Sequence, residues 1–159
     1  MHQTSQALLN SLVRIEEALL AARVHPLSSR KTLLVAVLVD NFCDEIFAAL
    51  RHEAPARVFF AEDVLAFRDR LGAEEPALRL VFDLCAFVPR GPRLETHAIA
   101  VPIEAYGELS IEDFMVSLYN ANTVQRVVIV AEGGRASLAH EVLDDAIGYL
   151  KRTVLPKAT

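Results

Sequence analysis

The sequence has no tryptophan and only two cysteines, Cys43 and Cys85. The two cysteines lie far apart in apolar stretches, and neither belongs to a CxxC pattern or to a Cys/His spacing of the kind that binds zinc. A zinc cluster and a disulfide framework are therefore not expected. Both side chains are predicted to be buried free thiols in a reducing compartment.

Long apolar runs and basic runs are missing as well. The longest strongly apolar run, residues 33–39, stops at Asp40 and is far shorter than the ~20 residues that span a membrane. Residues 1–6 lack the basic region that opens a signal peptide. The formal net charge is −5, which disfavours binding to nucleic-acid phosphates. These absences predict a soluble cytoplasmic protein that binds neither membranes nor nucleic acids.

Apolar residues, by contrast, are abundant. They make up 53% of the 159 residues, somewhat above the ~45–50% of an average domain. A chain of this length buries enough surface to fold without a metal or a disulfide. We expect a single globular domain over residues 1–159, with a helical hairpin at 4–52 and an α/β portion at 56–153. The surplus of apolar surface is expected to lie in the interface of a two-fold homodimer.

The N-terminal third has the periodicity of two helices. Apolar residues recur every three or four positions in residues 4–22, which predicts the first helix. A second helix is predicted for residues 29–52, because a serine precedes an apolar stripe that continues to Leu50. Valines at alternate positions make residues 32–39 compatible with a strand too. The helix is preferred because the stripe continues unbroken beyond them.

The rest of the chain is predicted to alternate strands and helices in the order β-β-α-β-α, over residues 77–88, 95–103, 110–120, 125–131 and 136–152. The first two strands are expected to pair as an antiparallel hairpin. The strand–helix–strand piece should make a right-handed parallel crossover. We therefore expect an α+β (mixed α/β) fold, in which helices pack on a small mixed sheet. The order of the strands in that sheet is not predicted. A short edge strand at 57–60 and a helix ending at Gly72 precede it.

The first candidate binding site is the turn Gly133, Gly134 and Arg135, between a predicted strand and a predicted helix. Glycines let backbone amides approach a ligand, and the amides of a helix's first turn lack internal partners. Arg135 could add a bidentate grip on phosphate or carboxylate, although Glu132 places a negative charge nearby. The alternative is an ordinary turn.

The second candidate is the start of the predicted helix 29–52, where Ser28 and Ser29 precede Arg30 and Lys31. Basic residues in a helix's first turn face the positive end of its dipole, which is unfavourable. Residues that go against such a local preference are often found at functional sites. Two hydroxyls and two cations beside free amides suit an anion. The alternative is that both cations are solvated or paired with acidic neighbours.

The third candidate is acidic. Asp40 and Asp44 stand one turn apart on one predicted helix, and His140 and Asp144 repeat that spacing on the last helix. Carboxylates and histidines of this kind can hold a metal, but no known metal motif includes them. Solvated helix faces often carry such pairs, so no metal and no other cofactor is assigned.

No sequence feature points to catalysis. There is no GxSxG elbow, and the cysteines have no cationic neighbour in sequence that would activate them. His97, on the apolar face of a predicted strand, is expected to be a core histidine. The leading hypothesis is a non-catalytic binding or accessory protein that forms a homodimer. The sequence does not distinguish this hypothesis from a third one, an adaptor that binds another protein. The alternative is a small-molecule enzyme or ligand sensor that holds an anion at residues 133–135.

Overall fold

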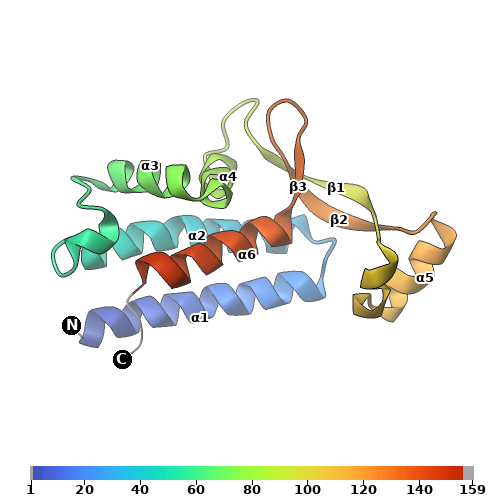
Figure 1. Cartoon of the computed structure of the whole chain (residues 1–159), viewed down its shortest axis with the longest axis horizontal. Coiled ribbons are helices and arrows are strands. Elements are labelled where there is room, and N and C mark those ends of the chain that lie inside the picture. Colours follow the sequence, from blue (N-terminus) through green and yellow to red (C-terminus); the bar gives the residue numbers. More distant parts are fainter. Residues whose placement is uncertain (1, 156–159) are drawn as a thin grey trace.

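The computed structural model describes residues 2–155 and combines helices with a three-stranded antiparallel sheet (Figure 1). Met1 and residues 156–159, which the expected domain includes, lie outside the described residues. The predicted α+β class is confirmed. The elements follow in the order α1 (His2–Val24), α2 (Ser29–Leu50), η1 (Pro55–Val58), α3 (Val64–Glu74), α4 (Pro76–Cys85), β1 (Arg93–Ala100), η2 (Ile103–Glu108), α5 (Ile111–Tyr119), β2 (Thr123–Val130), β3 (Ala136–Leu138), α6 (Ala139–Tyr149) and η3 (Leu150–Val154).

The predicted helical hairpin is confirmed, because α1 and α2 pack along one another (Figure 1). The Ser28 hydroxyl caps α2 by accepting a hydrogen bond from the Lys31 amide at 3.1 Å. Residues 32–39 are helical throughout, so the strand alternative for them is wrong. The core-facing stripe of α1 consists of Leu8, Leu12, Ile15, Leu19 and Ala22.

The strand predicted at 77–88 is wrong, since these residues lie largely in α4. Pro76 occupies the start of the helix, where its missing N–H costs nothing, and the Glu75 carboxylate accepts a hydrogen bond from the Ala77 amide at 3.2 Å. Leucines at alternate positions suggested a strand. The residues that α4 buries most completely, Leu78 and Val81, are instead spaced as on a helix.

The short strand predicted at 57–60 is also wrong. Pro55 opens the 3₁₀ turn η1 instead, and Phe59 and Phe60 follow it with left-handed backbone angles. The next helix is α3, which the Asp63 carboxylate caps through the Ala66 amide at 2.8 Å. Gly72 lies inside this helix and does not end it.

The sheet has the strand order β1-β2-β3, and both pairings are antiparallel. The register of β1 and β2 runs from Arg93 opposite Val130 to Ala100 opposite Thr123. The predicted parallel crossover is therefore wrong, and the sheet is antiparallel where a mixed one was expected. The predicted pairing of 77–88 with 95–103 also fails, because β1 finds its partner in β2.

Five helices, α1 to α4 and α6, form what we call the helical body. Within it, α6 packs against α1, α2 and α4, and its residues share one core with the other helices. Among the described residues, the sheet contributes Val127 and Ile129 of β2 to this core, and Leu94 of β1 packs against it. Among the described residues, no helix is long and apolar enough to cross a membrane.

Candidate functional site

The most unusual feature of the molecule is the arm, which we define as residues 93–130. Figure 1 shows β1 and β2 running away from the helical body as a ribbon, with η2 and α5 at its far end. β3 pairs only with residues 128–130 of β2, so the outer part of the ribbon is two-stranded. A two-stranded ribbon is marginally stable alone in water, which makes a helix mounted at its tip an element that needs further contacts.

Specific contacts attach α5 to the ribbon. The Ser110 hydroxyl caps the helix by accepting from the Asp113 amide at 3.1 Å. Arg126 of β2 donates to the Asp113 carboxylate at 3.0 Å. The rings of Tyr106 and Phe114 meet edge to face, with 6.1 Å between their centroids. These contacts fix α5 on the arm but cover little of its apolar surface.

Among the nine residues of α5, Ser117 is the buried one. Ile111 and Tyr119 are each 83% exposed. A large apolar residue has a total accessible surface on the order of 200 Å². Multiplying this area by the exposed fraction of each apolar residue of α5 gives a summed apolar surface of roughly 700 Å² in contact with water. The largest apolar patch of a typical monomer is about 300–600 Å². The six exposed apolar side chains are Ile111, Phe114, Met115, Val116, Leu118 and Tyr119.

A groove of about 680 Å³ lies along the first turns of α2. Leu33, Leu34 and Val37 line it with apolar side chains, and Leu34 is 52% exposed. Arg30 and Lys31 line it too, and neither takes part in an ion pair among the described residues. The second predicted site is thus brought together in part: its two cations and Ser28 share the groove, whereas Ser29 does not line it.

A larger cleft of about 880 Å³ separates the turn between α1 and α2 from the arm. Ser28 lines both the cleft and the groove, so the two hollows adjoin. Residues distant in the sequence meet here. The lining residues are Arg23, Val24, His25, Pro26, Leu27, Ser28, Glu108, Ser110, Glu112, Asp113, Arg126 and His140.

His140 reaches this cleft from the first turn of α6. Its Nε2 atom is buried and has no hydrogen-bond partner among the described residues. Burial lowers the pKa of His140 below its ordinary value of 6.5, and the nearby charges of Arg23 and Arg126 lower that pKa further. The carboxylate of Asp144 raises that pKa, but its effect is smaller than the effects that lower it. The imidazole is therefore neutral at pH 7.

The cations of the cleft already have partners. Arg23 pairs with Asp144 of α6, and Arg126 pairs with Asp113. Glu108 and Glu112 take part in no ion pair among the described residues. The cleft therefore presents carboxylates rather than free cations, which makes it a poor site for an anion.

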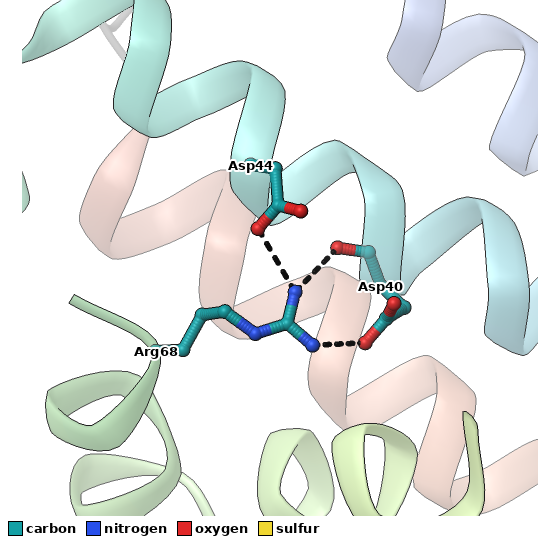
Figure 2. Close-up of polar contacts among 3 residues, drawn as sticks. All are labelled: Asp40, Asp44 and Arg68. Atoms are coloured by element: carbon teal, nitrogen blue, oxygen red, sulfur yellow. Dashed lines mark hydrogen bonds and ion pairs between the residues drawn. The ribbon is translucent and has the colours of Figure 1, made fainter. Parts of the chain in front are cut away.

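The predicted acidic pair on α2 is occupied by an arginine from α3 (Figure 2). Arg68 donates to Oδ1 of Asp44 at 2.9 Å, to the backbone carbonyl of Asp40 at 3.2 Å and to the Asp40 carboxylate. Its guanidinium lies 4.3 Å from the ring centre of Phe82. Burial alone would lower the pKa of Arg68, but hydrogen bonds to both carboxylates outweigh it and raise that pKa. The two aspartates therefore join α2 to α3.

The weak metal candidates are not brought together as one site. Asp40 and Asp44 of α2 bind Arg68, whereas Asp144 of α6 pairs with Arg23 of α1 and His140 lines the large cleft. Within residues 2–155, no group of three or more histidine, cysteine or acidic side chains is arranged to hold a metal ion.

The glycine turn is placed differently from the prediction. Residues 131–135 form the turn of a hairpin between β2 and β3, in which the Ala131 amide donates to the Arg135 carbonyl at 2.8 Å. Gly133 and Gly134 have φ angles of 87° and 82°, which favour glycine. The helix α6 starts only at Ala139, so the expected strand-to-helix turn is wrong and no helix N-terminus adjoins the glycines.

The cysteines and His97 are not placed for catalysis. Burial raises the pKa of the Cys43 thiol, and burial raises the pKa of Cys85 to about 12. Both therefore remain protonated thiols near neutral pH. His97 is not the expected core histidine, because its side chain is 40% exposed and lies 3.7 Å from Glu95.

Two features of the structure are not predicted from the sequence. Arg68 follows its aspartate partners by 24 to 28 residues, and nothing in its local sequence announces that contact. The display of α5 did leave a signal. Six of its nine residues are apolar, more than one buried face of so short a helix can use.

Comparison with known proteins identifies no relative. No family model matches the chain, no curated protein matches it, and no solved structure matches its fold. Function is therefore inferred from the geometry of the chain itself.

Proposed function

We propose that the chain is a non-catalytic binding or accessory protein that works as a homodimer, with α5 in the interface between two copies. The exposed apolar surface of α5 carries this proposal. Its roughly 700 Å² approaches the ~800 Å² that each partner contributes to an interface of standard size. A two-fold dimer would cover this surface on both copies at once.

The composition of α5 supports the same assignment. Cores of protein interfaces are enriched in aromatic residues and methionine, and α5 exposes Phe114, Met115 and Tyr119. The helical body does not need these side chains, because its core is formed by α1 to α4, α6 and the base of β2. An apolar helix that its own core does not use is best explained by a partner surface.

The experiment is sedimentation of the wild-type chain across a dilution series. We expect a species of twice the 17.5 kDa chain mass. Leu118 is 56% exposed, so replacing it by lysine should leave the circular dichroism spectrum unchanged. The same change should place a charge in the apolar interface and give a monomer. The matched control is Leu65→Lys on α3, where the leucine is 69% exposed, and it should stay dimeric. A wild-type chain that remains monomeric at every concentration would overturn the proposal.

The alternative, an enzyme or sensor that holds an anion at Gly133, Gly134 and Arg135, stays a prediction. Its support is that Arg135 is exposed and that the space where a Cβ would stand on Gly133 or Gly134 is open, with no atom within 4 Å apart from the adjoining residues. We place it second because the strand β3 lies between the glycine turn and the first turn of α6, so the amides of that helix do not add to an anion site at the glycines.

A further inference from the structure

The free end of the arm carries one sign of charge. Residues 101–122 include four carboxylates, Glu104, Glu108, Glu112 and Asp113, and no lysine or arginine. Asp113 is paired with Arg126, whereas Glu108 and Glu112 are exposed. The tip of the arm is thus both apolar and acidic.

The groove on α2 has the complementary character. Its lining is mostly apolar and carries Arg30 and Lys31, which are exposed. These cations stand in the first turn of α2, at the positive end of the helix dipole, where they are unfavourable. A carboxylate brought against them would remove that penalty, so the groove favours an acidic, apolar partner.

The dimensions agree as well. The nine residues of α5 extend about 13 Å at 1.5 Å per residue, close to the length of α2 between Arg30 and Val37. Ile111, Phe114, Met115 and Leu118 follow the i, i+3, i+4, i+7 spacing with which an amphipathic helix fills a groove.

We infer that α5 of one copy docks in the α2 groove of a second copy, with Glu108 and Glu112 facing Arg30 and Lys31, and that the second arm does the same in return. This inference rests on the proposed homodimer and specifies its contact. Within one chain, the ribbon holds α5 at its far end (Figure 1), across the large cleft from the turn that precedes the groove. The groove of another copy is therefore the better partner.

The experiment is a charge swap in the full chain. The groove variant carries Arg30→Glu and Lys31→Glu, and the arm variant carries Glu108→Lys and Glu112→Lys. Acids in the first turn of α2 suit its dipole, so the groove variant should fold normally. Each variant alone should dimerise roughly tenfold or more weakly, because like charges then meet. An equimolar mixture should regain wild-type affinity, since groove and arm are complementary again in the mixed dimer.

The control variant reverses two exposed arginines outside the groove and the arm, with Arg14→Glu and Arg90→Glu, and should dimerise as the wild type does. A groove variant that dimerises normally, or a mixture that stays monomeric, would overturn the docking inference. If Leu118→Lys still abolished the dimer in that case, the homodimer would stand with α5 packed elsewhere. A monomeric wild type would overturn both proposals.

Discussion

Replacing Arg68 by alanine should destabilise the protein more than any replacement of a surface arginine. Arg68 serves Asp40 and Asp44 together, and the side chains of Arg68 and Asp40 are only 20% and 18% exposed. Without the guanidinium, the Asp40 carboxylate keeps its burial and loses its cation. The contact with the ring of Phe82 is lost at the same time.

The magnitude follows from the burial of the pair. Removing one partner of a fully buried ion pair costs about 3–5 kcal/mol. About a fifth of each side chain reaches water, which will hydrate part of the stranded charge. We therefore expect the free energy of unfolding to fall by about 2–3 kcal/mol. For a chain of this length the melting temperature should drop by roughly 5–10 °C.

Urea unfolding followed by circular dichroism measures this change. The control is Arg70→Ala on the same helix, since Arg70 pairs at 2.8 Å with Glu74 while 57% exposed. An exposed pair of this kind should contribute at most about 0.5 kcal/mol. A double-mutant cycle with Asp40→Asn should give a coupling of about 1 kcal/mol or more. Equal losses for Arg68→Ala and Arg70→Ala would refute the reasoning.

Two further predictions concern the other candidate sites. The lowered pKa of His140 means that the unfolded chain binds the proton more tightly, so stability should be full above about pH 6.5 and fall as the pH drops below it. His140→Gln should flatten that dependence in urea unfolding at pH 5.5 and 7.5, and an unchanged slope would show that His140 does not cause it. For the alternative function, phosphate or a carboxylate should raise the melting temperature saturably in the wild type but not in Arg135→Ala. The absence of any shift in the wild type would eliminate that function.

The sequence predicted elements well where periodicity was long and unambiguous. α1 and α2 were predicted because their stripes run over five turns or more. α4 was missed because its ten residues satisfy both periods, with leucines at alternate positions and the buried pair Leu78 and Val81 at helical spacing. The start signals, Glu75 and Pro76, favoured the helix and deserved more weight than the alternation.

The site was harder to predict because it depends on tertiary arrangement. The antiparallel pairing of β1 with β2 carries α5 outwards, whereas a parallel crossover would have folded the same helix back onto the sheet. The glycine turn was found, but the three residues Ala136–Leu138 are too short for any period to reveal that they form a strand. Contacts such as Arg23 with Asp144 join residues over a hundred positions apart, and local patterns cannot show them.

The geometry of the ribbon has an evolutionary consequence. Because Arg93 lies opposite Val130, the chain leaves the body and returns to it at neighbouring points. The outer part of the arm, residues 95–126, supplies none of the side chains of the described residues that form the core of the helical body, whereas Val127 and Ile129 near its end do. Substitutions in residues 95–126 can therefore change the exposed surface of α5 while the core of the helical body stays the same, so that surface can diverge faster than the helices that support it.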